Sequence, residues 1–273
     1  MFPDIRYVRA AAALRFTAEA RDPAIRRQLS RLPLVGGMSS IPARAQNLPE
    51  VLRRVLPQVD RLHLFLHGYD AVPQGLERDG LLIYRCGTDH PYRASGKFYG
   101  LSQEPGPCLY FGFDDDILYP ARHVRMLRAA LLRYGGRALV GIHGSRYVRP
   151  FIRFTGERLL RGFWNGLPFD ETVDVVGAGT CAFASEVVRF SPPAWLYGDM
   201  DDLMLAQEAE RLGLPRVVVG RPSRSLQALP VLDEGLWGGA VRDDSRQTEQ
   251  LKRLIEMIDN RPGAAKRKAL PAQ

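Results

Sequence analysis

From residue 34 onward, short runs of apolar residues alternate with longer segments of helical periodicity. Residues 61–66 (RLHLFL) and 108–113 (CLYFGF) have the length and the aromatic or branched composition of strands. Alternation of this kind builds βαβ units, so the sequence predicts an α/β fold with a mostly parallel sheet flanked by helices. The expected strands are 34–39, 61–66, 81–84, 108–113, 138–142, 173–176 and 216–219, and the expected helices are 49–56, 120–134, 202–212 and 247–258.

Two stretches interrupt this alternation. Residues 144–172 and 220–246 are rich in glycine, arginine, proline and aromatic residues. Long irregular loops in a compact domain are usually functional. We therefore expect both stretches to be loops that form the rim of a site.

The composition excludes several other classes of protein. No run of about twenty apolar residues occurs, as a membrane-spanning helix would require. No apolar N-terminal core precedes a small-residue cleavage site, so we expect no signal peptide. The three cysteines, Cys86, Cys108 and Cys181, lack the spacing of a zinc site or a disulfide framework. These features together predict a cytoplasmic protein.

The net charge of +8 is located at the two ends of the chain. Residues 1–35 hold seven arginines and three acids, residues 261–273 hold four basic residues and no acid, and the remainder has 27 of each sign. A nucleic-acid-binding domain carries its excess charge on the folded body, so we expect no nucleic acid partner. The basic ends are either solvated or dock on an anionic membrane surface or an acidic partner.

The N-terminal basic segment contains a helix signal. Asp22 is a suitable N-cap, and Pro23 suits the first helical position. We therefore divide the chain into a basic helical extension at 1–33, a main domain at 34–260 and a basic, disordered tail at 261–273.

Three adjacent carboxylates, Asp114, Asp115 and Asp116, directly follow the expected strand 108–113. Like charges this close repel one another unless a cation lies between them. Ligands of open α/β sheets bind beyond the carboxyl ends of the strands, and Mg²⁺ is commonly held there by one or two carboxylates together with substrate phosphates. The alternative is an acidic turn that caps the helix near Pro120.

Lys97 is an unusual choice of residue, because every other basic side chain before Lys252 is an arginine. Its compact ammonium group suits a phosphate, and Gly96 before it permits a close approach of the backbone. The alternative is an ordinary surface lysine.

Seven segments resemble, in the same order, motifs of bacterial capsule glycosyltransferases with the GT-A fold, above all the α-N-acetylglucosaminyltransferase subunit of heparosan-type capsule synthesis. They are 38–44 (MSSIPAR), 56–60 (LPQVD), 96–98 (GKF), 114–120 (DDDILYP), 140–144 (VGIHG), 177–180 (GAGT) and 234–237 (EGLW). The resemblance covers roughly residues 36–240. It implies a Rossmann-like GT-A fold and a metal-dependent enzyme that transfers a sugar from a UDP-sugar donor to a surface-polysaccharide or other glycan acceptor.

The same resemblance implies finer properties. The transferred sugar would be GlcNAc, with retention and an α-linkage, and the cofactor would be Mn²⁺ or Mg²⁺. The enzyme would lie on the inner face of the plasma membrane, where its basic ends would contact anionic lipid or a partner glycosyltransferase subunit.

The resemblance also implies roles for individual residues. Metal binding would fall to Asp116 with Asp114. The nucleotide-sugar would be bound by Ser39, Pro42, Arg44, Lys97, Asp114 and Asp115. Contacts to the donor sugar or the acceptor would come from Gly177, Gly179, Thr180 and Trp237. The catalytic side chains would be Asp202, Asp201 and His143.

Several of these residues also suit purely structural roles. Arg44 could be solvated, and His143 could be a structural histidine at the end of a strand. Asp201 and Asp202 could simply favour the start of a helix. Trp237 could belong to the core.

Three other functions remain open. An inverting transferase of the same fold would use Asp202 as its general base. A sugar-phosphate nucleotidyltransferase would need an early glycine-rich loop ending in basic residues, which residues 36–40 (GGMSS) do not provide. A non-enzymatic protein that binds nucleic acid or membrane would act through the basic ends.

Overall fold

The computed structural model describes residues 22–188, 198–230 and 235–261, without the side chains of 235–237. In this part of the chain a central sheet has eight strands, in the order β3-β2-β1-β4-β11-β6-β12-β9. The strands are β1 (Leu34–Ser40), β2 (Arg61–His67), β3 (Leu81–Cys86), β4 (Leu109–Asp114), β6 (Leu139–Gly141), β9 (Glu171–Thr172), β11 (Cys181–Ala184) and β12 (Arg216–Val218). Strands β3, β2, β1 and β4 are parallel to one another, as are β6 and β12. The predicted α/β class with a mostly parallel sheet is confirmed.

Strand β11 differs from the expected pattern, because it lies antiparallel between β4 and β6. Its four residues are all buried. A run of four apolar residues is too short to predict a strand, so residues 181–184 were not among the expected strands. Such a run also gives no signal for the direction of the strand.

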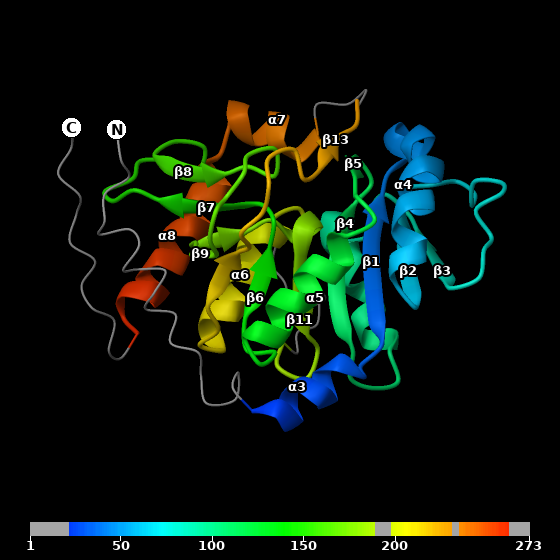
Figure 1. The fold of residues 1–273 in the computed structure, drawn as a ribbon. Coiled ribbons are helices and arrows are strands. Elements are labelled where there is room, and N and C mark those ends of the chain that lie inside the picture. The colour runs from blue at the N-terminus through cyan, green and yellow to red at the C-terminus, as the bar shows by residue number, and fades with distance from the viewer. Residues whose placement is uncertain (1–21, 189–197, 231–234, 262–273) are drawn as a thin grey trace.

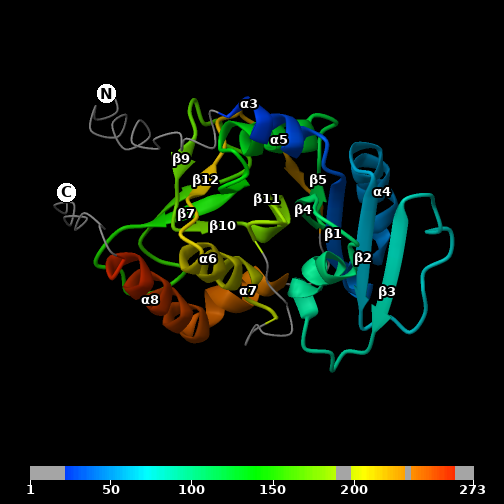
Figure 2. The ribbon, with the colours of Figure 1, turned by 90° about the horizontal axis from the view of Figure 1, so that it is seen from below.

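Helices cover both faces of this sheet, as Figures 1 and 2 show. One face packs against α3 (Pro23–Ser30), α4 (Leu48–Val55) and α5 (His123–Arg133). The other packs against the 3₁₀ helix η3 (Arg93–Gln103) and α6 (Asp201–Arg211), and α8 (Ser245–Asp259) lies against α6.

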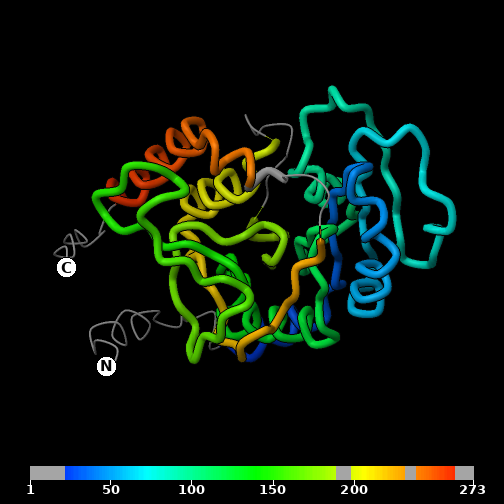
Figure 3. Tube along the Cα trace, turned by 90° about the horizontal axis from the view of Figure 1, so that it is seen from above, coloured from blue at the N-terminus to red at the C-terminus, as the bar shows by residue number. Residues whose placement is uncertain are grey.

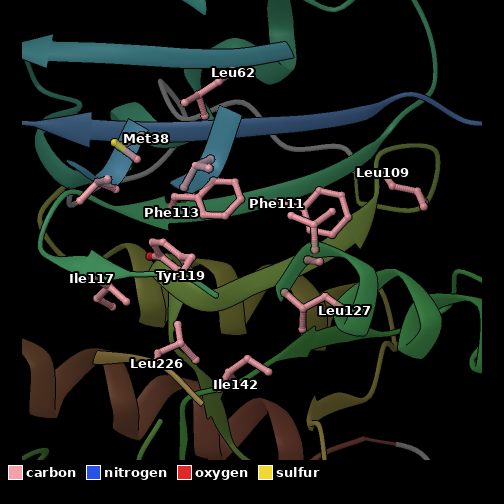
Figure 4. Packing of buried hydrophobic residues seen from close by; sticks show 14 of the residues in the cluster. Met38, Leu62, Leu109, Phe111, Phe113, Ile117, Tyr119, Leu127, Ile142 and Leu226 are labelled. Carbon is pink, nitrogen blue, oxygen red and sulfur yellow. The ribbon is translucent and has the colours of Figure 1, made fainter. Parts of the chain in front are cut away.

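Strand β4 shows how the sequence pattern produces these layers. Leu109, Phe111 and Phe113 face the α4–α5 side, while Tyr110 between them faces the η3–α6 side. Successive side chains of a strand point to opposite faces, so an all-apolar run is stable only when both faces are covered. Figure 4 shows Phe111 above Leu127 of α5 and Phe113 above Tyr119, within one buried cluster.

The two stretches expected to be irregular loops contain regular structure, so that prediction is wrong in part. Strands β7 (Gly144–Tyr147) and β8 (Arg158–Arg161) lie within the first stretch. Together with β10 (Val175–Val176), which follows that stretch, they form a second sheet. Strand β13 (Gln227–Ala228) pairs with β5 (Ile117–Leu118), and α7 spans Gly235–Arg242. Elements of two to four residues are too short to produce a periodic pattern. In Figure 1, β8, β13 and α7 lie at the same end of the molecule as β5, the end that Figure 3 shows from above.

Helix α3 begins where the sequence predicted. Asp22 Oδ1 accepts a hydrogen bond of 2.7 Å from the backbone N–H of Ala24, and Pro23 is the first helical residue. The helix packs on α5 through buried Leu29, and Arg128 Nη2 donates to the carbonyl of Ser30 at 2.5 Å. The remaining basic extension, residues 1–21, and residues 262–273 lie outside the described part.

None of the helices in the described ranges is long and apolar enough to cross a membrane.

His123, at the start of α5, is a buried titratable group. Its ring lies 5.9 Å from that of Phe113 and 4.8 Å from that of Tyr119, and neither ring nitrogen has a hydrogen-bond partner among the described residues. Burial lowers the pKa of His123 to about 3. The folded protein therefore holds this imidazole neutral.

We predict that His123→Phe reduces the loss of stability in acid. Between about pH 6.5 and pH 3 the unfolded chain binds a proton at this histidine that the folded chain does not, so the free energy of unfolding falls as the pH falls. Urea unfolding at pH 7 and pH 5 should show a drop in the variant that is smaller by about 1–2 kcal/mol. His90→Phe, at a partly exposed histidine, is the control. An equal pH dependence in wild type and His123→Phe would contradict the prediction.

Candidate functional site

The candidate site lies where the connections of the sheet diverge. Strands β1 and β4 are parallel neighbours, and Ser39 of β1 is in register with Asp114 of β4. The chain continues from β1 outward to β2 and β3, whereas β4 begins the other half of the sheet. Ligands of open α/β sheets bind at such a switch point, beyond the carboxyl ends of the strands. The predicted acidic triplet stands at this position.

The three carboxylates of the triplet lie in different environments. The side chains of Asp114 and Asp116 are 34% and 27% exposed, whereas that of Asp115 is 3% exposed. Arg44 Nη1 contacts Asp115 Oδ1 at 3.2 Å and Asp116 Oδ2 at 2.9 Å. Arg44 therefore holds the second half of the triplet, while Asp114 and Asp116 remain accessible to a ligand.

Lys97, on η3, holds the first residue of the triplet. Its Nζ lies 2.5 Å from Asp114 Oδ1 and 2.8 Å from Asp201 Oδ2, and the side chain is buried. Burial lowers the pKa of Lys97, but the charges of Asp114 and Asp201 outweigh burial, and the pKa lies well above its ordinary value. The ammonium group is therefore a permanent positive charge that joins β4 to the start of α6.

Tyr119 positions the backbone on both sides of Asp114. Its hydroxyl donates to the carbonyl of Gly179 at 2.6 Å and accepts from the backbone N–H of Asp114 at 2.8 Å. Gly179 lies on the 3₁₀ helix η4 (Ala178–Thr180), which is thereby fixed against the end of β4. Tyr119 was not among the predicted site residues, although it stands within the segment DDDILYP.

The start of α6 faces the same centre. Asp202 Oδ1 accepts a hydrogen bond of 2.6 Å from the backbone N–H of Ala178. Burial, and next the charge of Asp201, raise the pKa of Asp202 to about 7. Asp202 is therefore a carboxyl group that exchanges its proton near neutral pH. The backbone amide of Ala178 was not foreseen from the sequence, because backbone donors leave no signature there.

His143 follows β6 and lies next to η4. Its backbone N–H donates to Thr180 Oγ1 at 3.1 Å, and its carbonyl accepts from the N–H of Gly177 at 2.9 Å. Burial, with the charges of Arg158 and Arg221, lowers the pKa of His143 to about 4. The imidazole is thus neutral at physiological pH.

The remaining predicted residues are placed as follows. Ser39 Oγ donates to the carbonyl of Arg93 at 2.8 Å, which ties β1 to η3. Pro42 begins the 3₁₀ helix η1 (Pro42–Asn47), which carries Arg44. Trp237 belongs to α7, and its side chain lies outside the described part.

The donor set can be tested for its fit to a divalent cation. In the described ranges no group of three or more His, Cys, Asp or Glu side chains forms a complete metal site. Burial, and next the charge of Asp114, raise the pKa of Asp116 to about 6, so the paired charges are unfavourable as they stand. A divalent cation would remove that repulsion, and Mg²⁺-type ions commonly take only one or two carboxylates besides substrate phosphates. Asp114 and Asp116 therefore fit a cation that shares its coordination with a ligand.

The excess of acid supports the same conclusion. Two cationic side chains, Arg44 and Lys97, pair with a larger group of carboxylates. That group comprises Asp114, Asp115, Asp116 and Asp201, and the charges of Asp201 and Lys97 also act on the nearby Asp202.

Comparisons with known proteins were informative at the level of structure. No family model matches the sequence, and no curated protein matches it either. Among solved structures, the chain is similar to one described as the crystal structure of GalNAc-T7 with UDP, GalNAc and Mn²⁺, with a TM-score of 0.53 and 8% sequence identity. The match covers 94% of this chain and 57% of that chain, so this chain spans little more than half of that protein's length.

This similarity defines the fold. The chain has the Rossmann-like architecture of GT-A glycosyltransferases, as the resemblance of its motifs implied.

We predict that Gly179→Ala destabilises the protein. A Cβ atom at Gly179 would lie 1.7 Å from Asp114 Oδ2, and Asp114 could rotate away only by leaving the buried ion pair with Lys97. Overpacking of this kind costs about 1–3 kcal/mol in the free energy of unfolding, which urea denaturation would measure. Gly106→Ala is the control, because a Cβ there meets nothing within 4 Å. Equal stability of the two variants would show that η4 does not press on Asp114.

Proposed function

We propose that the chain is a metal-dependent glycosyltransferase that transfers a sugar from a UDP-sugar to a glycan acceptor. The observation that carries this proposal is the position of Asp114 and Asp116, two accessible carboxylates at the β1–β4 switch point of a GT-A fold. A pyrophosphate with its cation is the ligand that best matches such a pair beside Arg44 and Lys97.

The chain's own residues then divide the work of binding the donor. Asp116, with Asp114, holds the cation, and Arg44 is partly exposed beside it, so its guanidinium can bind the nucleotide or a phosphate. Ser39 and Pro42 place the end of β1 and η1 against the nucleotide. Asp115 and Lys97, which were also predicted to bind the nucleotide-sugar, act indirectly. Asp115 orients Arg44, and Lys97 fixes Asp114. When bound, the divalent cation acts as a Lewis acid that stabilises negative charge on the diphosphate leaving group.

The transferred sugar lies between η4 and the start of α6 in this proposal. Gly177, Gly179 and Thr180 are buried, and the Thr180 hydroxyl bonds to the carbonyl of Gly177, so they would place the backbone of η4 next to the sugar. Trp237 of α7 would contribute a further contact. The neutral imidazole of His143 binds a hydroxyl group of the donor sugar or of the acceptor. We infer α-linked transfer of GlcNAc with retention as the first candidate, in which Asp201 and Asp202 bind the acceptor or stabilise positive charge on the donor sugar.

An inverting reaction is the second candidate, and one observation favours it. The pKa of Asp202 is raised to about 7, a value suited to a general base at neutral pH. In that reaction the carboxylate of Asp202 takes the proton of the acceptor hydroxyl, while the N–H of Ala178 keeps its other oxygen oriented.

The cellular setting is also part of the proposal. We place the protein in the cytoplasm, on the inner face of the plasma membrane, in the synthesis of a surface polysaccharide. The basic segments at the two ends of the chain would contact anionic lipid or a partner glycosyltransferase subunit.

The proposal is tested by incubating the protein with a panel of UDP- and other nucleotide-sugars and Mn²⁺ or Mg²⁺. We expect metal-dependent hydrolysis of one UDP-sugar, detected as release of UDP. Proton NMR of the first anomer formed then distinguishes retention from inversion. A protein that neither binds UDP nor hydrolyses any donor in the presence of metal would overturn the proposal.

We predict that Asp116→Ala lowers kcat at least a hundredfold and abolishes the metal dependence of UDP binding, because the cation loses a charged ligand. Calorimetry with UDP, with and without Mn²⁺, measures the binding. Asp70→Ala is the control, since Asp70 is an exposed acid outside the triplet. Retention of metal-dependent UDP binding by Asp116→Ala would exclude the metal-binding role.

We predict that Asp202→Asn separates the two reaction courses. If Asp202 is the general base, the variant should lose about a hundredfold or more in kcat, and the rise of wild-type activity with pH through about 7 should disappear with it. If the reaction retains configuration, kcat should fall far less and the effect should appear mainly in the KM for the acceptor. A pH–rate profile with product NMR decides between them.

A further inference from the structure

A tryptophan outside the predicted site residues stands beside His143. Trp164 lies in the turn after β8, and its side chain is 48% exposed. Its ring is 6.1 Å from that of His143 and 5.0 Å from that of Phe163, which meets it edge to face. An indole has a large apolar face and one N–H donor, so an exposed indole next to a candidate site can stack on the ring of an amphipathic ligand.

The turn holds the indole in a fixed position. The carbonyl of Gly162 accepts hydrogen bonds from the N–H of Asn165 at 3.0 Å and from Arg221 Nη2 at 2.7 Å. The N–H of Arg224 donates to the carbonyl of Trp164 at 2.9 Å. The indole packs over Gly162 so closely that a Cβ atom there would lie 2.5 Å from the ring. A ring supported in this way loses little conformational entropy when a ligand covers it.

The polar partner of the tryptophan is His143. Its Nδ1 atom is buried and has no hydrogen-bond partner among the described residues. The imidazole therefore keeps a hydrogen-bonding capacity that the described residues do not use, and a ligand hydroxyl group can take it up. His143 is also tied to Thr180 of η4, and the charge of Asp114 acts on its imidazole. The apolar ring and the unpaired nitrogen therefore lie side by side at the rim of the acidic centre.

We propose that Trp164 and His143 form the acceptor subsite, in which a pyranose ring stacks its C–H face on the indole and a hydroxyl group bonds to the imidazole of His143. This inference rests on the proposed glycosyltransferase function. An amphipathic ligand is required, because one partner is apolar and the other is a hydrogen-bonding group. Pyranoses whose hydroxyl groups are equatorial fit best, since their axial C–H bonds form a flat apolar face. Cellobiose and N,N′-diacetylchitobiose are disaccharides of this type.

The test uses the full chain labelled with 5-fluorotryptophan, saturated with UDP and Mn²⁺ and titrated with each of these two disaccharides. The ¹⁹F resonance of Trp164 is assigned by its absence from Trp164→Phe. We expect this resonance to shift with at least one disaccharide. The Kd measured by calorimetry should weaken about tenfold or more in Trp164→Ala and less in Trp164→Phe, which keeps a ring.

Two further variants separate the subsite from a general surface effect. Gly162→Ala keeps the indole but displaces it, so it should weaken disaccharide binding as well. Phe169→Ala removes another exposed aromatic ring of the same segment, 68% exposed, and should leave the Kd unchanged. Thermal melting shows that each variant is folded.

The possible failures are distinguishable. If wild type binds UDP with Mn²⁺ but neither disaccharide shifts the Trp164 resonance, or if Trp164→Ala and Phe169→Ala bind alike, the subsite is refuted and the glycosyltransferase proposal stands. If wild type does not bind UDP at all, both proposals are refuted.

Discussion

The ion pairs of Lys97 with Asp114 and Asp201 are the interaction on which the site depends. A buried ammonium group is very costly unless charged partners surround it, and these two carboxylates come from β4 and α6, on opposite sides of the centre. Removing either carboxylate would leave part of the positive charge uncompensated. The lysine thus fixes the distance between the acidic triplet and the start of α6, and any ligand that enters meets carboxylates already held in place.

Around this charge cluster, the backbone is positioned by a few neutral groups. Tyr119 links Asp114 to η4, and Asp202 accepts a hydrogen bond from the N–H of Ala178 in the same helix. Because η4 is held by both, its peptide groups and Thr180 present a rigid edge. His143 continues that edge toward Trp164. The charged centre and the apolar rim are therefore linked to each other through η4 and His143.

Much of the fold could be predicted from the sequence because burial patterns are local. The apolar run that ends at Phe113 fixed both a strand and the position of the triplet at its carboxyl end. The Asp22-Pro23 pair fixed the start of α3. The short strands within 144–172 and the antiparallel direction of β11 could not be predicted, since two to four residues carry neither a period nor a direction.

What the sequence determined by itself was therefore the class of fold and the residues with chemistry to offer, among them Asp114, Asp116 and Lys97. Only the tertiary structure decided which of them meet. Asp115 turned inward to Arg44 while its neighbours stayed accessible, and Asp201 joined Lys97 from a distant part of the chain. Trp164 became a candidate site residue only because the structure places its ring beside that of His143. The physical reason is that strand and helix patterns arise between near neighbours in the chain, whereas contacts between charges and rings depend on how whole elements pack.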